Sequence, residues 1–211
     1  MRMRRKPKLE SRMEKCAHLL INEPDDLRGR WLNEFVFDEL YVELGCGKGL
    51  FTVEMAKRCP DKLFVALEKV TNVIVIALER TKQEKLQNVR YINGFADDLP
   101  DFFAEGEVSR LYINFCDPWP AKRHEKRRLT GWRFLELYKP ALRQGGEIHF
   151  KTDNLSLFEY SLREFDRCGF TLINISRDLH KDGIVGVMTD YEMKFYEQGK
   201  PIYEAVYSPD V

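Results

Sequence analysis

Residues 41–49 read YVELGCGKG, and this stretch sets the architecture that we expect for the whole chain. A short strand-like apolar run leads straight into three glycines, and a helix-like pattern begins immediately after them. Glycines at the end of a strand let the backbone turn tightly and approach a ligand closely. The spacing is GxGxG, because Leu50 stands where the GxGxxG dinucleotide fingerprint requires glycine, and the sequence has no GxxxxGK[ST] phosphate loop. The turn therefore argues against a nicotinamide, flavin or nucleoside triphosphate as the ligand.

Apolar runs and helix-like stretches alternate through most of the chain beyond this turn. Such alternation is typical of a parallel sheet covered by helices on both faces. The last apolar run follows Pro201 and predicts that the sixth and seventh strands close the sheet as an antiparallel hairpin. The expected strands are 40–44, 63–68, 89–93, 110–115, 146–151, 170–175 and 202–207, and the expected helices are 13–21, 49–58, 71–86, 130–142, 155–167 and 191–199.

Length and composition predict one globular unit. We expect residues 1–8 to form a basic flexible arm and 9–211 a single domain, with an N-terminal extension at 9–38 and a core at 39–211. No run approaches the roughly 20 apolar residues needed to cross a bilayer, and no signal peptide is expected, so we expect a cytoplasmic protein. The five cysteines are scattered with no CxxC pair, so no metal site is expected.

The net charge is zero, but the charges are segregated along the chain. Residues 1–8 hold five basic groups, and 122–128 hold five more with Glu125 as the single acid. The rest of the chain has 24 basic groups against 33 acids. This distribution suits a surface that presents cations to phosphates while the remainder stays acidic, although each basic run could also be a solvated loop.

Two acids follow the first and second expected strands. Glu68 ends the second strand 19 residues past Gly49, where a carboxylate can accept hydrogen bonds from both ribose hydroxyls of a nucleoside. Glu43 stands just before the glycines, and a carboxylate there would suit a cationic amino group and repel a pyrophosphate. The pattern therefore favours a ligand with a ribose, a methionine-like ammonium group and no pyrophosphate. The alternative is that both are exposed acids at strand ends.

The fourth expected strand ends in NFCDPWP, residues 114–120, followed at once by the basic run at 122–128. Two prolines stiffen the turn after Asp117, and Trp119 offers a face on which a base could stack. Ligands of such sheets collect at the carboxyl ends of the strands, so this loop should lie beside the glycine turn. The sequence thus brings an acid, an aromatic ring and phosphate-binding cations to the expected ligand site.

In these motifs, and in KTDN at 151–154 and TDYE at 189–192, the chain resembles the tRNA (guanine-N7) methyltransferase family. The match extends from Gly29 to the C-terminus. The resemblance implies a Rossmann-like class I methyltransferase fold in the α/β class, S-adenosylmethionine as methyl donor and a guanine in the variable loop of tRNA as acceptor. It implies tRNA as the partner of a monomer or homodimer, with no obligate protein partner.

Site residues follow from the same resemblance. This chain departs from the family at Phe95 and Ala96, where an acid or amide often lies near the adenine ring, and at Ala121, where many members have lysine. We assign Asp97 and Lys122 in their place. Expected cofactor residues are Glu43, Gly45, Gly47, Gly49, Glu68, Phe95, Ala96, Asp97 and Asp117, with Asp117 also the catalytic residue; substrate residues are Lys122, Asp153, Thr189, Asp190, Tyr191 and Glu192; RNA-contacting residues are Arg123, His124, Glu125, Lys126, Arg127 and Arg128.

Guanine N7 carries no proton and already presents a lone pair, so its methylation needs no general base. Asp117 would then orient guanine or offset the growing positive charge. Two alternatives stay open. The DPWP loop is also similar to the loops of enzymes that methylate exocyclic amines, which would make adenine in RNA or DNA the acceptor. A non-catalytic RNA-binding protein on a methyltransferase fold is the other, although the presence of both cofactor acids argues against it.

Overall fold

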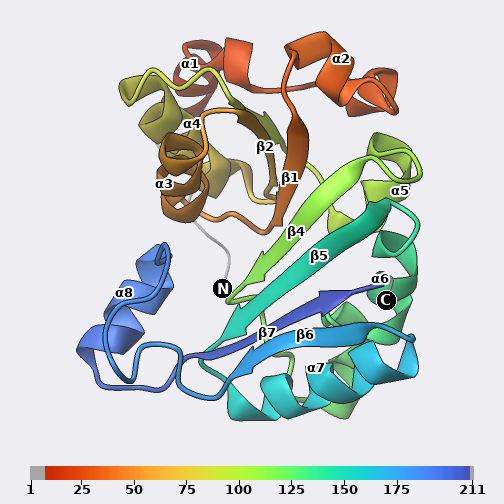
Figure 1. Ribbon diagram of the computed structural model, residues 1–211. Helices are drawn as coiled ribbons and strands as arrows, with labels where there is room; N and C mark the ends of the chain where they lie inside the picture. The colour runs from red at the N-terminus through yellow and green to blue at the C-terminus, as the bar shows by residue number, and fades with distance from the viewer. Residues whose placement is uncertain (1–7, 210–211) are drawn as a thin grey trace.

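The computed structural model describes residues 8–209, and the expected basic arm lies outside these residues except for Lys8. A seven-stranded sheet runs through the molecule in the order β3-β2-β1-β4-β5-β7-β6 (Figure 1). The pairs that join β3, β2, β1, β4 and β5 are parallel, and β7 runs antiparallel to both β5 and β6. The strands are β1 (Glu39–Leu44), β2 (Lys62–Leu67), β3 (Val89–Ile92), β4 (Val108–Asn114), β5 (Leu142–Thr152), β6 (Thr171–Ser176) and β7 (Tyr203–Ser208).

Helices cover both faces of this sheet. Figure 1 shows α1, α3 and α4 on one side, α5, α6 and α7 on the other, and α8 apart from both groups near the ends of β4 and β5. The Rossmann-like α/β prediction, including the antiparallel last strand, is confirmed. The α-helices are α1 (Leu9–Glu14), α2 (Trp31–Phe35), α3 (Leu50–Arg58), α4 (Thr71–Gln83), α5 (Leu99–Phe102), α6 (Trp132–Tyr138), α7 (Leu155–Arg167) and α8 (Asp190–Glu197), and the 3-10 helices are η1 (Ala17–Leu19), η2 (Pro24–Leu27), η3 (Ala96–Asp98) and η4 (Lys122–Arg127).

The two-residue period of β1 divides its side chains between two hydrophobic clusters. Leu40, Val42 and Leu44 belong to the cluster that includes α6 and α7, whereas Tyr41 belongs to the cluster that includes α3 and α4. Alternate side chains of a strand point to opposite faces, so Glu43 lies on the same face as Tyr41. An acidic side chain is therefore buried beneath α3 near the end of β1.

The structure differs from the sequence prediction in several elements: α2, α5 and η4 are not among the expected elements, and β5 begins at Leu142, the last residue of the expected helix 130–142. The helix expected at 13–21 is wrong: α1 ends at Glu14, and a separate 3-10 turn follows because the chain bends to bury Cys16 and Leu19. Strands β6 and β7 pair as predicted but are not joined by a short hairpin turn. Their connection, 177–202, contains α8 and carries it to the carboxyl edge of the sheet.

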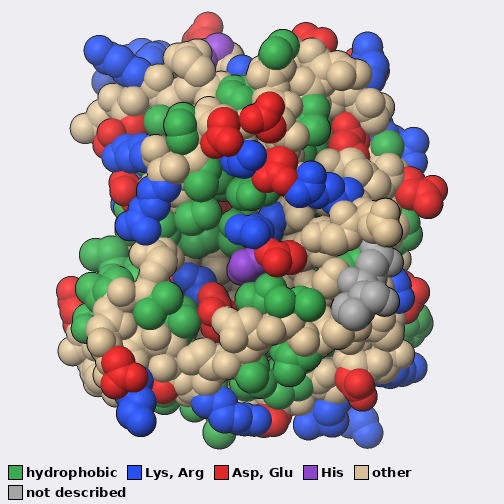
Figure 2. All heavy atoms as spheres, in the orientation of Figure 1, with side chains coloured by type: hydrophobic (Ala, Val, Ile, Leu, Met, Phe, Trp, Pro, Cys, Tyr) green, Lys and Arg blue, Asp and Glu red, His purple; other side chains and the backbone are tan. Residues whose placement is uncertain are grey.

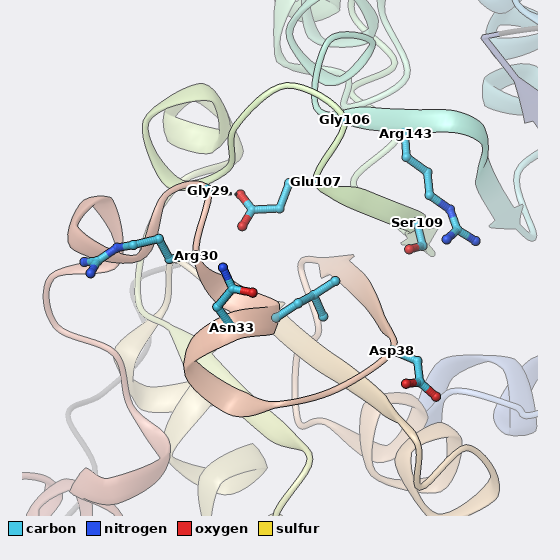
Figure 3. A pocket seen from close by; sticks show the side chains of 9 residues that line it. Gly29, Arg30, Asn33, Asp38, Gly106, Glu107, Ser109 and Arg143 are labelled. Carbon is cyan, nitrogen blue, oxygen red and sulfur yellow. Dashed lines mark hydrogen bonds between the residues drawn. The ribbon is translucent and has the colours of Figure 1, made fainter.

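The segment before β1 is attached to the core by buried contacts. Trp31 is completely buried, and its Nε1 donates to the Phe102 carbonyl at 2.9 Å. The Glu107 carboxylate accepts from the backbone N–H groups of Gly29 at 2.8 Å and Trp31 at 3.1 Å. These bonds lie at the amino edge of the sheet beside a hollow of about 260 Å³, which is also lined by Asp38 and Arg143 (Figure 3).

The turn after β1 lies directly on α4. Gly49 has φ +75°, and a Cβ built on it would lie 2.5 Å from the Ala77 Cβ. Gly47, with φ +58°, has open space around the same position. Glycine is therefore required at 49 by both conformation and space, but at 47 by conformation alone.

We predict that Gly49→Ala lowers the free energy of unfolding by about 3 kcal/mol, the sum of a left-handed backbone and an overpacked contact with Ala77. Gly47→Ala is the matched control and should cost about 1 kcal/mol, because only the backbone term applies. Urea unfolding followed by circular dichroism measures both values. Equal losses for the two variants would contradict the close packing of Gly49 on α4.

Candidate active site

The carboxyl ends of β1, β4 and β5 bring three buried polar side chains together. Asn114 at the end of β4 is the register partner of Lys151 in β5, and its Nδ2 donates to Glu43 Oε1 at 3.1 Å. The Thr52 hydroxyl, in the first turn of α3, donates to the other oxygen of Glu43. All four residues are at most 6% exposed. Hydrogen bonds of Glu43 thus connect β1 with α3 and β4, and Lys151 of β5 lies alongside.

Burial raises the pKa of the Glu43 carboxyl to about 6. The hydrogen bonds from Thr52 and Asn114 and the charge of Lys151 act in the opposite direction but do not cancel the loss of water. Ionisation of this buried carboxyl group costs free energy, and a cationic ligand group beside it would stabilise the ionised form. The environment of Glu43 is therefore suited to accept an ammonium.

Asn114 has an unused acceptor at the same point. Its Oδ1 is buried and has no hydrogen-bond partner, whereas its Nδ2 is committed to Glu43. Buried acceptors are almost always paired in native proteins, so an unpaired one indicates a missing donor. Glu43 and Asn114 together present a carboxylate and a carbonyl oxygen, the acceptors that an ammonium group requires.

Glu68 closes the glycine turn from the end of β2. Its two carboxylate oxygens accept from the Gly47 N–H at 3.2 Å and the Val70 N–H at 2.9 Å. The backbone N–H of Gly45 donates to the Leu67 carbonyl at 2.8 Å, which completes the turn. A carboxylate has about four acceptor positions, so half-exposed Glu68 retains capacity for two hydroxyl donors.

The residues that we assigned to the adenine side of a cofactor follow the end of β3. Phe95 is 58% exposed and precedes η3, whereas Ala96 is half-buried. Asp97 is exposed, and its Oδ1 accepts from Arg133 of α6 at 2.7 Å. Asp97 is therefore already paired with a cation, and Phe95 presents the larger free surface at this position.

The loop after β4 has a strained backbone around Asp117. Phe115 at φ 50° and Trp119 at φ 40° occupy the left-handed region, which bulky residues rarely adopt. Arg128 holds this conformation, because its guanidinium donates to the carbonyls of Pro118 at 3.1 Å and Trp119 at 3.0 Å. Asp117 is exposed between these fixed points. Strain of this kind is typical of sites where a side chain is held in one direction.

The basic run forms η4, an element that the sequence analysis did not anticipate. Within it, Lys122, Arg123, Lys126 and Arg127 are exposed to solvent. The Arg127 guanidinium lies 4.8 Å from the centre of the Trp119 ring, and the His124 ring packs edge-on against the same indole. Trp119 is thus partly covered from within its own loop. Of the eight residues at 121–128, only His124, Glu125 and Arg128 are half-buried.

The C-terminal motif lies against the same edge of the sheet. Thr189 is the N-cap of α8, and its hydroxyl accepts from the Glu192 N–H at 2.9 Å. Asp190 forms a bidentate ion pair with Arg80 of α4. Tyr191 is 62% exposed, whereas Glu192 is fully buried. The four expected substrate residues of this motif therefore divide into one exposed ring, Tyr191, and three side chains with partners inside the protein.

Figure 2 shows a hollow between the half of the molecule that carries α3 and the half that carries α8. Hydrophobic side chains lie in this hollow. The Phe195 ring of α8 lies 6.0 Å from the Phe115 ring, so α8 reaches the loop that carries Asp117. Asp153 follows β5 at the same edge and is half-buried. The hollow of Figure 3 lies at the opposite, amino edge.

Comparison with known proteins gives a family for this arrangement. A family model described as "putative methyltransferase" matches residues 38–205. The chain is 47% identical over 207 residues to the tRNA (guanine-N(7)-)-methyltransferase of Bacillus subtilis, covering 97% of both chains. It is 48% identical to the enzyme of the same name from Geobacillus kaustophilus, covering 99% of this chain and 98% of the relative. The chain belongs to the tRNA (guanine-N(7)-)-methyltransferase family.

Solved structures support the fold at lower identity. An antibiotic-related methyltransferase has a TM-score of 0.64 and 17% identity, with 84% of this chain and 92% of that chain covered. The 16S rRNA methyltransferase KamB has the same TM-score and identity, with 87% and 90% covered. The class I methyltransferase fold expected from the resemblance is thereby confirmed.

Several residues of this methyltransferase site carried no role in the sequence analysis. Asn114 and Lys151 lie inside quoted motifs, but nothing in the motifs shows which atoms face Glu43. His180 has no ligand spacing to another histidine, so the sequence gives it no role. Arg80 lies in a helix 110 residues from its partner Asp190. The sequence signal that Asn114 and Lys151 share is their position, because each lies at or next to the end of a buried strand.

Glu43 generates a prediction about stability and pH. Its carboxyl has an ordinary pKa of 4.5 and a pKa of about 6 in the folded protein, so folding favours the protonated form. The resulting stability is present in full below pH 4.5 and is lost as the pH rises through 6, an effect of about 2 kcal/mol.

We therefore expect Glu43→Gln to unfold at a higher temperature than the parent protein at pH 8 and at a similar temperature at pH 4. The neutral amide fits the same space and needs no ionisation. Differential scanning calorimetry across this range measures the difference, with Glu105→Gln at an exposed turn as the control. A parallel pH dependence for the parent and Glu43→Gln would contradict the burial of this charge.

Proposed function

We propose that this chain transfers a methyl group from S-adenosylmethionine to N7 of a guanine in the variable loop of tRNA. The observation that carries the proposal is the identity of 47–48% over nearly the whole chain to enzymes named tRNA (guanine-N(7)-)-methyltransferase. These names favour guanine N7 over the exocyclic amine of adenine that the sequence left open. The shared methyltransferase family likewise favours an enzyme over a non-catalytic RNA-binding protein.

The described residues fit S-adenosylmethionine. Glu43 and the unpaired Oδ1 of Asn114 would hold the ammonium of the methionine part, and Glu68 would accept from the ribose hydroxyls. The glycine turn between them has positive φ at 45, 47 and 49 and leaves space for a ligand at the first two positions. Phe95, at the end of β3, offers an exposed ring to the adenine. When bound, S-adenosylmethionine supplies a methyl group on a positively charged sulfur.

Asp117 is the residue that we assign to the guanine. N7 needs no general base, so the protein contributes positioning and charge stabilisation. The strained backbone at Phe115 and Trp119 and the two bonds from Arg128 hold the loop that presents Asp117. A carboxylate there can accept from the N1–H and N2–H edge of guanine or offset the positive charge that develops on the ring. Asp153 and the segment 189–192 complete the pocket in this proposal.

The exposed cations of η4 are suited to the phosphates of the same tRNA. Lys122, Arg123 and Lys126 are exposed and adjacent to the Asp117 loop, so phosphate contacts there would orient the guanine toward the site. Arg128 has a second role, because its guanidinium is committed to the loop carbonyls and lies 4.2 Å from the Tyr160 ring centre. Arg127 is also exposed, but its guanidinium lies over the Trp119 ring. We therefore assign most of the phosphate affinity to Lys122, Arg123 and Lys126.

A monomer or homodimer that acts in the cytoplasm on tRNA is consistent with this proposal. Among residues 8–209, no helix is long and apolar enough to cross a membrane. In the same part of the chain, no three His, Cys, Asp or Glu side chains gather in a group that could hold a metal ion.

Replacing the proposed guanine ligand should separate turnover from binding. We expect Asp117→Asn to lower the rate of methyl transfer to bulk tRNA by about 100-fold, since a positioned electrostatic contact is typically worth 10²–10³. Affinity for tRNA, measured by fluorescence anisotropy, should change less than twofold. Mass spectrometry of digested tRNA identifies the methylated nucleoside. Asp166→Asn, at an exposed position of α7, is the control, and near-normal turnover of Asp117→Asn would overturn the assignment.

Salt dependence tests the phosphate contacts. For the parent protein, the logarithm of tRNA affinity should fall steeply with the logarithm of salt concentration. Combining Arg123→Gln with Lys126→Gln should reduce this slope by about one unit for each lost contact. Arg30→Gln with Arg143→Gln, both beside the hollow at the amino edge, serves as a charge-matched control. Equal slopes for the η4 double variant and the parent would show that Arg123 and Lys126 are ordinary solvated charges that do not contact phosphates.

A further inference from the structure

The buried carboxylate of Glu192 joins three separate pieces of the chain: β5, the loop at His180 and the start of α8. It accepts from Lys151 Nζ at 2.7 and 3.0 Å, from His180 Nε2 at 2.9 Å and from the Thr189 N–H at 3.1 Å. The Glu192 side chain has no solvent exposure, and those of Lys151 and His180 are 6% and 2% exposed. Both carboxylate oxygens of Glu192 thus accept hydrogen bonds from within the protein, and no part of the side chain is exposed to a substrate.

Lys151 and His180 extend this network into the loop that precedes α8. Lys151 Nζ also donates to the Val187 carbonyl at 3.0 Å. His180 Nδ1 accepts from the Val185 N–H at 3.2 Å, which assigns the ring proton to Nε2 and directs it at Glu192. The network therefore contains one cation, one anion and a neutral imidazole, so its charges balance.

Two further contacts attach the same segment from the outside. The ion pair of Arg80 with Asp190 joins the first residue of α8 to α4, and Arg58 Nη1 donates to the Gly186 carbonyl at 3.2 Å. Residues 186–192 are consequently held from β5, α3 and α4. The exposed ring that results is Tyr191, stacked 6.5 Å from Phe195, which in turn contacts Phe115 in the Asp117 loop.

We propose that Lys151, His180 and Glu192 are positioning residues that fix the start of α8 and so present Tyr191 to the guanine. This inference rests on the proposed function, and it changes one assignment within it. Glu192 acts through the backbone and through Tyr191, and it does not touch the substrate. Lys151 also lies beside Asn114 and Glu43, whereas His180 bonds only within the segment that leads into α8. Loss of His180 should therefore impair the acceptor and leave the cofactor unaffected.

His180 offers the cleanest test, because its replacement leaves the Lys151–Glu192 ion pair intact. We expect His180→Phe to raise KM for tRNA about tenfold and to lower kcat, with S-adenosylhomocysteine affinity within twofold of the parent protein by calorimetry. His180→Gln carries both a donor and an acceptor and should recover most of the activity. Parent values of kcat and KM in His180→Phe, with reduced thermal stability alone, would overturn the proposal.

A double replacement tests whether Glu192 touches guanine. Lys151→Met alone leaves a buried unpaired carboxylate, whereas Lys151→Met combined with Glu192→Leu removes both charges. If Glu192 only positions α8, the double variant should be at least tenfold more active than Lys151→Met. If Glu192 binds guanine, the double variant will be no more active than Lys151→Met, and the proposal fails.

Hydrogen exchange keeps this inference separate from the proposed function. Amides at 185–192 should exchange at least tenfold faster in His180→Phe than in the parent protein, while those of β1 and β4 stay unchanged. A parent protein that methylates no tRNA, combined with this local loss of protection, would refute the proposed function and not the network. Unchanged exchange at 185–192 would refute the network itself.

Discussion

The close approach of the glycine turn to α4 is the constraint on which the site depends. Because Gly49 has no side chain, the turn lies against Ala77, and α3 begins directly above the end of β1. Thr52 in the first turn of α3 can then reach Glu43, and the backbone at Gly47 can reach Glu68. Two acids from different strands are in this way oriented by a single backbone bend.

Buried charge is concentrated at the carboxyl edge of the sheet. Glu43, Lys151 and Glu192 all lie there, although ionised side chains are rarely buried without partners. Lys151 and Glu192 compensate each other through short hydrogen bonds. Glu43 has only neutral donors in contact, and its raised pKa reflects this deficit. One buried pair thus stabilises the shape of the site, while the isolated acid remains available to a cationic ligand.

The same edge combines rigid and exposed parts. The loop at 115–119 is strained and tied by Arg128, and α8 is held by Glu192 and Arg80. Asp117 and Tyr191 are the exposed side chains that these two anchored segments carry. Positioning by fixed backbone is the contribution that methylation of N7 requires, because the acceptor already presents its lone pair.

The sequence by itself determined the alternation of strands and helices, the glycine turn and the motifs that reveal the family. These signals are local, since each depends on residues adjacent in the chain or on a short period. The tertiary structure alone decided which polar groups meet. Asn114 and Glu43 are 71 residues apart, and Lys151 and Glu192 are 41 apart, so no local pattern predicts their contact. It also decided that Glu192 is buried while its neighbour Tyr191 is exposed, because the start of α8 is held by Lys151 of β5 and Arg80 of α4.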